Sequence, residues 1–475
     1  MIIYRCAVLA VQWSTLLSVF STGTRAVTTM FGSLAGMLRR DVTQGLMVTI
    51  TLQVGGGIVS FAMFSLAARV LSAPEFGHLA LWLSVCQMAS VAALLGQEMF
   101  ILRSLNEYSV AKRPDLAKGS LLFSIGLVSV VPLLAGAAIA LLGTTMPGQT
   151  TALSLATGLF LVLSSMLALS SHIARSTVGI FMADGMRELF WRALVVATLL
   201  GLTVAGLHIQ IDQFFLIGSL ALAVALLIQV TAVWRAFPRD IFPAKAVWRL
   251  REWARTSSGF WASTLLETVN QYFDVVIVYW FLDPVSAGAY FIATRLSNMF
   301  ATVLAAVHNF ATRRIPALYF AGQTDELNGV LRRMAEVVLL CVIAGLAIIG
   351  FGAEYILALF GPNFVDQKWT LIILTGGTAM YAAGGPASAI LMIAGFQARY
   401  PLIVAANIGI RFIGFAVLIP IWGLQGAAAS AALSLAIVTV VLNVLCRRWV
   451  GVDPSVLNLI VKPAAVLVHV AKKAP

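Results

Sequence analysis

Four polar side chains stand at helical spacing inside one long apolar stretch, "LLETVNQYFDVVIVYWFLD", at residues 265–283. They lie at i, i+3, i+4 and i+7, so a helix would place them on one face: Glu267, Asn270, Gln271 and Asp274. A buried carboxylate can bind a proton or a sodium ion, because its surroundings set its protonation. We therefore predict Glu267 and Asp274 as ion-coupling residues, and Asn270 and Gln271 as substrate-binding residues.

Two arginines lie inside other apolar stretches, Arg295 within 288–310 and Arg411 midway along 401–419. A guanidinium is always charged and presents paired donors that match phosphate oxygens, so both are candidate ligands of an anionic substrate. For both arginines the alternative is a structural buried salt bridge that fixes helix register. For Arg411 further alternatives are snorkelling and hydrogen bonds to backbone carbonyls.

The position of Pro284 between two apolar stretches suggests a helical hairpin. Asp274 and Arg295 are equally far from this turn in sequence, and so are Gln271 and Asn298. Antiparallel helices would bring each pair to similar depth, so we predict an ion pair between Asp274 and Arg295. Asn298 joins the candidate substrate-binding residues.

Composition places these residues in a membrane. Of 475 residues, 60% are hydrophobic and 11% charged, and the mean hydropathy is +0.95, whereas soluble domains are roughly 45–50% apolar and 25% charged. Many stretches reach the roughly 20 apolar residues that a spanning helix needs, and alternating barrel strands are not seen. The sequence predicts an all-α polytopic membrane protein. Its four cysteines are not closely paired, which argues against a metal site.

The charges of the loops test the prediction of twelve transmembrane helices. Of the 31 Lys and Arg residues, 25 fall on the side holding the N-terminus and 2 on the opposite side. This asymmetry accounts for the net charge of +12 without nucleic acid, and it predicts an inner-membrane protein with both termini cytoplasmic. The predicted helices are 44–68, 77–102, 119–142, 150–171, 189–207, 214–234, 258–281, 288–310, 337–360, 369–394, 401–419 and 423–446.

The same reading divides the chain into five parts. They are an N-terminal extension at 1–40, a six-helix lobe at 41–234, a basic cytoplasmic linker at 235–257, a second six-helix lobe at 258–446, and a cytoplasmic or interfacial tail at 447–475. Arg5 and the apolar run after it resemble a signal peptide. A mis-assigned start or a short extra segment is favoured over cleavage.

An internal repeat relates the two lobes. "RVLSAPEFGHLALWLSV" from Arg69 aligns with "WFLDPVSAGAYFIATRL" from Trp280 at an offset of 211. Six crossings are an even number, so the halves share one orientation and are predicted to be related by an axis along the membrane normal, with substrate at their interface. At this offset the polar stripe corresponds to Gly56, Val59, Ser60 and Met63, which predicts a smooth, glycine-rich wall for a lipid tail. The glycines at 55–57 could alternatively permit a helix bend.

With these two motifs and "WGLQGAAASAALS" from Trp422, residues 40–446 resemble the polysaccharide repeat-unit flippases. These are the O-antigen and exopolysaccharide transporters of the multidrug/oligosaccharidyl-lipid/polysaccharide exporter superfamily. The resemblance implies a MATE-like fold with a pseudo-twofold axis. It also implies movement of an undecaprenyl-diphosphate-linked oligosaccharide to the outer leaflet by alternating access, for polysaccharide or lipopolysaccharide biosynthesis.

The partners implied are the lipid-linked oligosaccharide and membrane lipids, and contact with polysaccharide polymerase machinery is left open. One chain holds both halves, so a monomer suffices, and no cofactor is expected. An ion-coupled multidrug exporter of the same superfamily is the alternative, because Glu267 and Asp274 suit cationic drugs. An enzyme is disfavoured, since every outer loop is short. No phosphate-binding loop for ATP occurs, so the energy for transport is expected from a gradient, a partner or consumption of the product.

Overall fold

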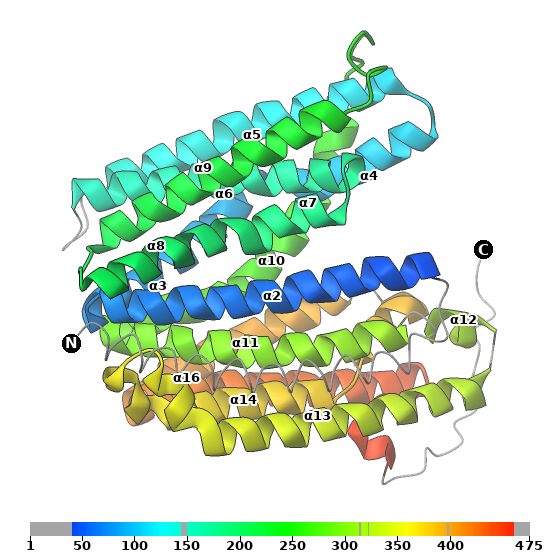
Figure 1. Ribbon diagram of the computed structural model, residues 1–475. Coiled ribbons are helices and arrows are strands. Elements are labelled where there is room, and N and C mark those ends of the chain that lie inside the picture. Colours follow the sequence, from blue (N-terminus) through cyan, green and yellow to red (C-terminus); the bar gives the residue numbers. More distant parts are fainter. Residues whose placement is uncertain (1–39, 144–149, 313–314, 322, 397–398, 460–475) are drawn as a thin grey trace. The chain divides into compact units, whose positions relative to one another are not determined.

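The computed structural model describes residues 40–143, 150–312, 315–321, 323–396 and 399–459 (Figure 1). These ranges form helices and loops, and none of their residues lies in a β-strand. Nine helical segments within them are long and apolar enough to cross a membrane. The chain is therefore a multi-pass, all-helical membrane protein. The predictions for residues 1–39, and for the tail beyond residue 459, lie outside the described residues.

The chain divides into two compact units, and the boundary falls inside one helix, between Phe273 and Asp274. The first unit contains the described residues up to 273 together with Leu359–Gly361, and the second contains residues 274–358 and those from Pro362 onward. The lobes and linker that the sequence suggests, with lobes at 41–234 and 258–446, stay a prediction.

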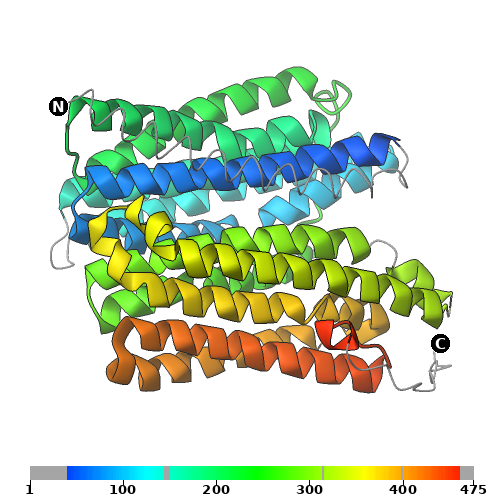
Figure 2. The ribbon, with the colours of Figure 1, turned by 60° about the horizontal axis from the view of Figure 1, so that its bottom comes forward.

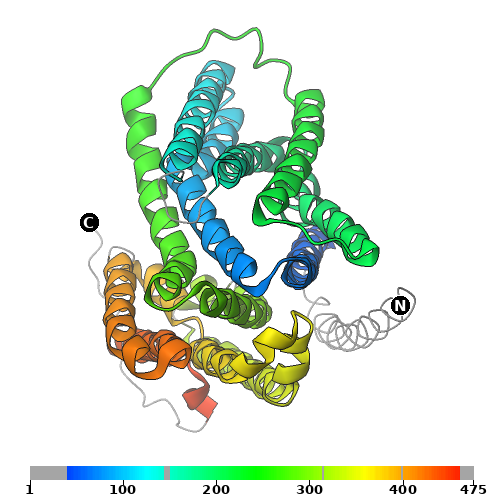
Figure 3. The ribbon, with the colours of Figure 1, turned by 90° about the vertical axis from the view of Figure 1, so that its left-hand side faces the viewer.

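The first unit is a bundle of long helices. Its elements are α2 (Arg40–Val70), α3 (Ala73–Leu94), α4 (Gln97–Val110), α5 (Pro114–Gly143), α6 (Thr151–Thr177), α7 (Ile180–Asp184), the π-helix η1 (Gly185–Phe190), α8 (Trp191–Ala205), α9 (Ile211–Ala236) and most of α10 (Leu250–Phe281). An irregular linker at 237–249 joins α9 to α10 (Figure 3).

The second unit begins with the last turns of α10. It continues with α11 (Pro284–Thr312), α12 (Ile315–Phe320), α13 (Thr324–Ala358), η2 (Pro362–Gln367), α14 (Lys368–Ala383), α15 (Ala387–Leu391), the π-helix η3 (Met392–Phe396), α16 (Tyr400–Trp449) and η4 (Val456–Leu459).

The internal repeat corresponds to a shared local structure, a capped helix start. Ser72 caps α3 by accepting a hydrogen bond from the Glu75 backbone N–H. At the aligned position Asp283 precedes α11, and its carboxylate accepts from the Ser286 backbone N–H at 3.0 Å. Each cap satisfies a backbone donor that the first helical turn leaves unpaired. Pro74 and Pro284 fall in these first turns, where proline removes no helical hydrogen bond.

Close helix packing in the first unit depends on small residues. A Cβ added to Gly136 of α5 would lie 2.8 Å from the Gly158 carbonyl of α6, and one added to Gly158 would lie 2.6 Å from the Gly136 carbonyl. The two backbones therefore touch with no side chain between them. Membrane helices commonly associate in this way, because lipid tails offer no hydrophobic driving force between them.

Helix α16 is a hairpin of two antiparallel arms that turn at Gly423, where φ is 56° and ψ −132°. The Ser430 hydroxyl donates to the Arg411 carbonyl at 2.9 Å, and a Cβ on Gly426 would lie 2.0 Å from the Leu418 carbonyl. The two arms lie side by side in Figure 2 (orange to red). This confirms the sequence prediction of two separate spans, 401–419 and 423–446.

The other predicted spans are found with shifted ends or local breaks. The span predicted at 77–102 breaks at Leu95 and Gly96, which have φ of 50° and 72°. The span at 369–394 breaks around Gly384 and Pro386, after which α15 and η3 follow. The span at 189–207 starts earlier, because α7 and η1 precede it without a turn.

Candidate functional site

A buried ion pair lies in the second unit. Asp274, in the last turns of α10, accepts a hydrogen bond from Nη1 of Arg411 on α16, with 2.8 Å between nitrogen and oxygen. Their side chains are only 10% and 7% exposed. Ionisable groups inside a membrane are costly unless they face protein or a watery cavity and find partners. The two helices therefore hold opposite charges where each neutralises the other.

Tyr290 of α11 completes this group, which we call the buried charge cluster: Asp274, Tyr290 and Arg411. The Tyr290 side chain is fully buried, and its hydroxyl donates to the same Asp274 oxygen at 3.5 Å. On α16, the Arg411 carbonyl accepts the Ser430 hydroxyl, which ties the arginine's own backbone to the second arm of the hairpin. Three helices thus fix the cluster's position.

The predicted pairing of Asp274 with Arg295 is wrong, since Arg411 pairs with this carboxylate. Equal distance from the hairpin turn correctly suggests similar depth, but depth does not fix rotation. Tyr290 is the α11 residue that meets Asp274. Arg295 follows it by five residues, which turns its side chain about 140° around the helix axis.

Arg295 instead lies over the ring of Phe291, with 4.7 Å between the guanidinium carbon and the ring centroid. Such a contact is favourable because the face of an aromatic ring is electron-rich. Arg295 is half-buried, and Asn298, one turn further along α11, is exposed. Between them in sequence, Ser297 exchanges a 2.6 Å hydrogen bond with Thr378 of α14, which fixes the rotation of this part of α11.

The predicted polar stripe on α10 divides between the two units. Glu267, Asn270 and Gln271 belong to the first unit and Asp274 to the second. Glu267 and Gln271 are exposed, Asn270 is half-buried, and Asp274 is buried. Of the four residues of the stripe, only Asp274 belongs to the buried charge cluster. The sequence does not show that α16 packs beside Asp274, so it could not predict this cluster.

Two glycines of the predicted smooth wall, Gly55 and Gly56, pack against protein. A Cβ on Gly55 would lie 3.3 Å from the Leu189 side chain, and one on Gly56 would lie 3.2 Å from both the Cβ and the carbonyl of Glu188. Both contacts come from the π-helix η1. These residues therefore allow α2 and η1 to approach closely, and the lipid-wall interpretation stays a prediction.

The first unit holds polar groups that sequence reasoning did not assign. Gln229 of α9 is fully buried and donates to the Met182 carbonyl of α7 at 3.1 Å. Glu188 and Arg192 form an i, i+4 ion pair at 2.7 Å across the end of η1. Their spacing is visible in the sequence, whereas the partner of Gln229 is set only by tertiary packing. In the described part of the chain, no three His, Cys, Asp or Glu residues gather as a metal site would need.

Comparison with solved structures identifies the fold. An inward-facing multidrug resistance MATE family transporter of the MOP superfamily is 14% identical, with a TM-score of 0.69, and the match covers 85% of this chain and 98% of that one. An outward-facing structure of such a transporter is 15% identical, with a TM-score of 0.59 and coverage of 86% and 95%. A mutant of a Vibrio cholerae MATE transporter is 12% identical, with a TM-score of 0.54 and coverage of 86% and 97%.

At these identities the similarity shows the fold alone, and that fold is the MATE fold that the sequence resemblance implies. No curated protein matches the chain. A family model described as "polysaccharide biosynthesis protein" matches residues 42–313, which is more than half of the chain. The chain therefore belongs to this polysaccharide biosynthesis protein family.

Proposed function

We propose that the chain is a flippase, which moves an undecaprenyl-diphosphate-linked oligosaccharide from the cytoplasmic to the outer leaflet by alternating access. The observation that carries the proposal is the family match over residues 42–313, on a chain with the MATE fold. A polysaccharide biosynthesis protein built almost wholly of membrane helices suits transport of a lipid-linked intermediate better than bond formation in water. The lipid-linked substrate and the localisation to the inner membrane are part of the proposal.

Arg295 is the better of the two arginines for the lipid diphosphate. The charge of Arg411 is already neutralised by Asp274, and breaking a buried pair leaves an uncompensated charge. Arg295 is half-buried on α11 beside the exposed Asn298. We assign these two residues to headgroup binding, whereas the substrate-binding roles of Asn270 and Gln271, which belong to the first unit, stay predictions from the sequence.

Asp274 is the proposed ion-coupling residue. A proton taken up by this carboxylate would weaken its attraction for Arg411 and so release the α16 arm from α10. Transport would then depend on the proton gradient through a single ion pair. Glu267 is exposed, and its carboxylate has no hydrogen-bond or ion-pair partner among the described residues, so we assign it a weaker role at the same step.

Complementation tests this function. A strain that lacks its polysaccharide flippase is given the wild-type chain, Arg295→Ala, Arg295→Lys or the control Arg332→Ala, and surface polymer is measured beside membrane expression. Arg332 is a matched control because it lies in the same unit with its side chain 61% exposed. We expect rescue by wild type and Arg332→Ala, no rescue by Arg295→Ala, and partial rescue by Arg295→Lys.

The second candidate is an ion-coupled multidrug exporter. It is favoured by the buried carboxylate of Asp274, and the solved relatives with this fold are multidrug transporters by name. The same strains, challenged with cationic drugs, separate the two functions. If wild type raises drug resistance and restores no polymer for any repeat unit tested, the flippase proposal is wrong.

A further inference from the structure

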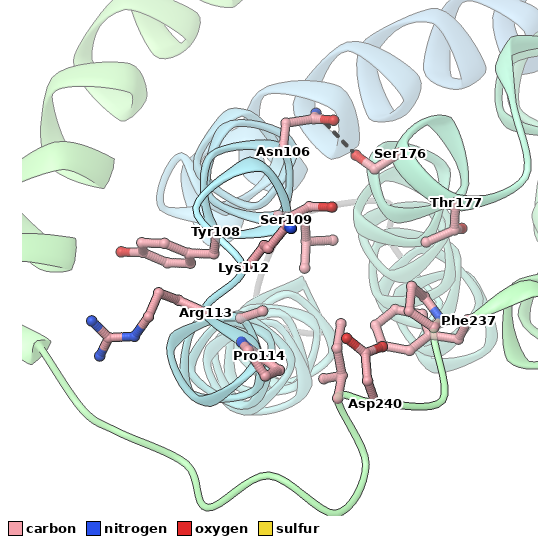
Figure 4. Close-up of a pocket in the computed structure, with 14 residues that line it drawn as sticks. Asn106, Tyr108, Ser109, Lys112, Arg113, Pro114, Ser176, Thr177, Phe237 and Asp240 are labelled. Atoms are coloured by element: carbon pink, nitrogen blue, oxygen red, sulfur yellow. Dashed lines mark hydrogen bonds between the residues drawn. The ribbon is translucent and has the colours of Figure 1, made fainter.

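A pocket of about 370 Å³ lies at one end of the first unit. It is lined by the ends of α4 and α6, by the start of α5, and by the linker that follows α9 (Figure 4). Its volume falls within the range of roughly 300–1,000 Å³ that is typical of small-molecule sites. None of the proposed transport residues lines it, so the pocket is separate from the site described above.

The pocket brings together three basic loops that are far apart in sequence. The sequence assigns these loops, at 103–118, 172–192 and 235–257, to the cytoplasmic side. Each contributes lining residues, at 105–117, 176–177 and 237–241. The pocket therefore lies where the spans of the first unit end, at the level of the lipid headgroups on the basic face.

One cation in the pocket is neutralised within the protein and one is not. Arg113 makes two hydrogen bonds to Asp115, at 3.0 Å and 2.8 Å, and Figure 4 shows its guanidinium directed away from the centre. Lys112 has no such partner in the described ranges. It adopts a left-handed conformation with φ of 53° after the end of α4, which turns the chain here. The pocket therefore offers one available ammonium group to an anion.

Negative potential comes from three helix ends and from one carboxylate. Helices α4, α6 and α9 end at Val110, Thr177 and Ala236, beside the pocket. The carboxyl end of a helix carries a partial negative charge and favours cations. Asp240 adds a full negative charge, and its carboxylate has no hydrogen-bond or ion-pair partner in the part of the chain that the structure describes.

Neutral polar groups line the rim that lies away from Asp240. Asn106 donates to the Ser176 hydroxyl at 3.4 Å on one rim, and Asp240 lies on the other, with Lys112 between them in Figure 4. These side chains can both donate and accept hydrogen bonds. The pocket is thus bipolar, with one available cation and one available carboxylate.

An aromatic path leads from the pocket to the exposed surface. Phe237 lines the pocket and contacts Phe242, with ring centroids 5.7 Å apart. Phe242 in turn contacts Trp234 at 5.2 Å, and the two are 42% and 69% exposed. Exposed aromatic residues at the ends of spans commonly mark the membrane–water interface. A ligand in this pocket could therefore keep acyl chains in the bilayer.

We propose that the pocket binds the phosphoethanolamine headgroup of a membrane phospholipid. The phosphate lies against Lys112, and the primary ammonium lies against Asp240 and the helix ends. A primary ammonium donates three hydrogen bonds, which a trimethylated ammonium cannot do. An anionic headgroup such as phosphoglycerol would bring a negative charge and no cation to the carboxylate rim. The pocket is therefore selective for phosphatidylethanolamine.

Lipid binding to the full-length chain tests the proposal. Protein purified in detergent and stripped of lipid is titrated with short-chain phosphatidylethanolamine, phosphatidylglycerol or phosphatidylcholine, and bound lipid is counted by native mass spectrometry. We expect wild type to bind phosphatidylethanolamine about tenfold more tightly than either other lipid. Lys112→Gln and Asp240→Asn should each abolish this preference. Both residues are exposed, so both variants should fold.

Two matched variants control for lost charge. Lys245→Gln removes an exposed lysine from the same linker. Asp212→Asn removes a carboxylate at the start of α9. Neither residue lines the pocket. Both should keep the wild-type preference. The proposal is overturned if phosphatidylglycerol or phosphatidylcholine binds as tightly as phosphatidylethanolamine, or if the pocket variants keep the preference. Tight binding of soluble phosphoethanolamine without the lipid would overturn the lipid assignment.

Discussion

Nη1 of Arg411 lies 2.8 Å from Oδ2 of Asp274, and both side chains are at least nine-tenths buried. Each charge is stable in this position only because the other is present. The pair links α10 to the first arm of α16, two helices that are 137 residues apart at these positions.

Replacing either Asp274 or Arg411 alone should therefore destabilise the chain far more than replacing both. Asp274→Leu or Arg411→Leu alone should lower the free energy of unfolding by about 3–5 kcal/mol, because an unpaired charge stays buried. The double variant should recover most of this loss. Thermal denaturation of the detergent-purified chain measures the three values. The exposed pair Arg332 and Glu336 is the control, where leucine variants should change stability by less than about 1 kcal/mol. Additive losses in the double variant would contradict the argument.

The turn of the α16 hairpin provides a second prediction. Gly423 has a φ of 56° that suits glycine, yet a Cβ there would have open space around it. Gly423→Ala should therefore cost about 1–3 kcal/mol through backbone strain alone. Gly409, in the same helix, also has open space around it but no positive φ. Gly409→Ala should be neutral or slightly stabilising in the same denaturation measurement. Equal effects of the two changes would show that the turn is not strained.

The contact between α2 and η1 distinguishes packing from a lipid-facing wall. Gly56→Val should reduce thermal stability and membrane expression, because the added side chain would meet Glu188. Gly201 of α8 is exposed, and a Cβ there would meet nothing within 4 Å. Gly201→Val should be tolerated. Normal stability of Gly56→Val, with a defect in transport alone, would support the lipid-wall interpretation.

A buried hydrogen bond joins α10 to α4 within the first unit. Trp253, which is 1% exposed, donates from Nε1 to the Tyr108 hydroxyl at 2.9 Å. Trp253→Phe and Tyr108→Phe should each destabilise the chain by about 1–3 kcal/mol. Tyr108→Phe leaves the Trp253 N–H without its acceptor, and Trp253→Phe leaves the Tyr108 hydroxyl without its donor and also leaves a void. The double variant should lose less than the two losses combined. Trp234→Phe, at an exposed ring, is the control and should have little effect.

Much of the fold follows from the sequence because hydropathy and loop charge depend on one dimension, the depth in the membrane. Apolar runs and the distribution of Lys and Arg indicate which segments span, and the α16 hairpin was separated correctly at residues 420–422. The ends of helices are less predictable where the backbone conformation of single residues decides them. Leu95 and Gly96 interrupt α3 and α4 with left-handed φ values, which a polar-to-apolar pattern does not reveal.

The site was only partly predictable, because helix rotation and helix neighbours are not contained in hydropathy. The polar stripe correctly marked Asp274 as a buried group, and the apolar surroundings of Arg411 marked the arginine. That the two meet depends on α16 packing beside the end of α10, a contact between segments with no common sequence motif. The sequence suggests a smooth wall or a bend at the glycines at 55 and 56, whereas the structure shows that they let η1 approach α2 closely, and hydropathy does not identify that neighbour.

The separation of 137 residues between Asp274 and Arg411 also has a consequence for biosynthesis. The ribosome makes the acid first, and at roughly 5–20 residues per second the arginine follows about 7 to 27 seconds later. During this interval the Asp274 carboxyl has no Arg411 to pair with. The ion pair can therefore form only after the first arm of α16 has been synthesised.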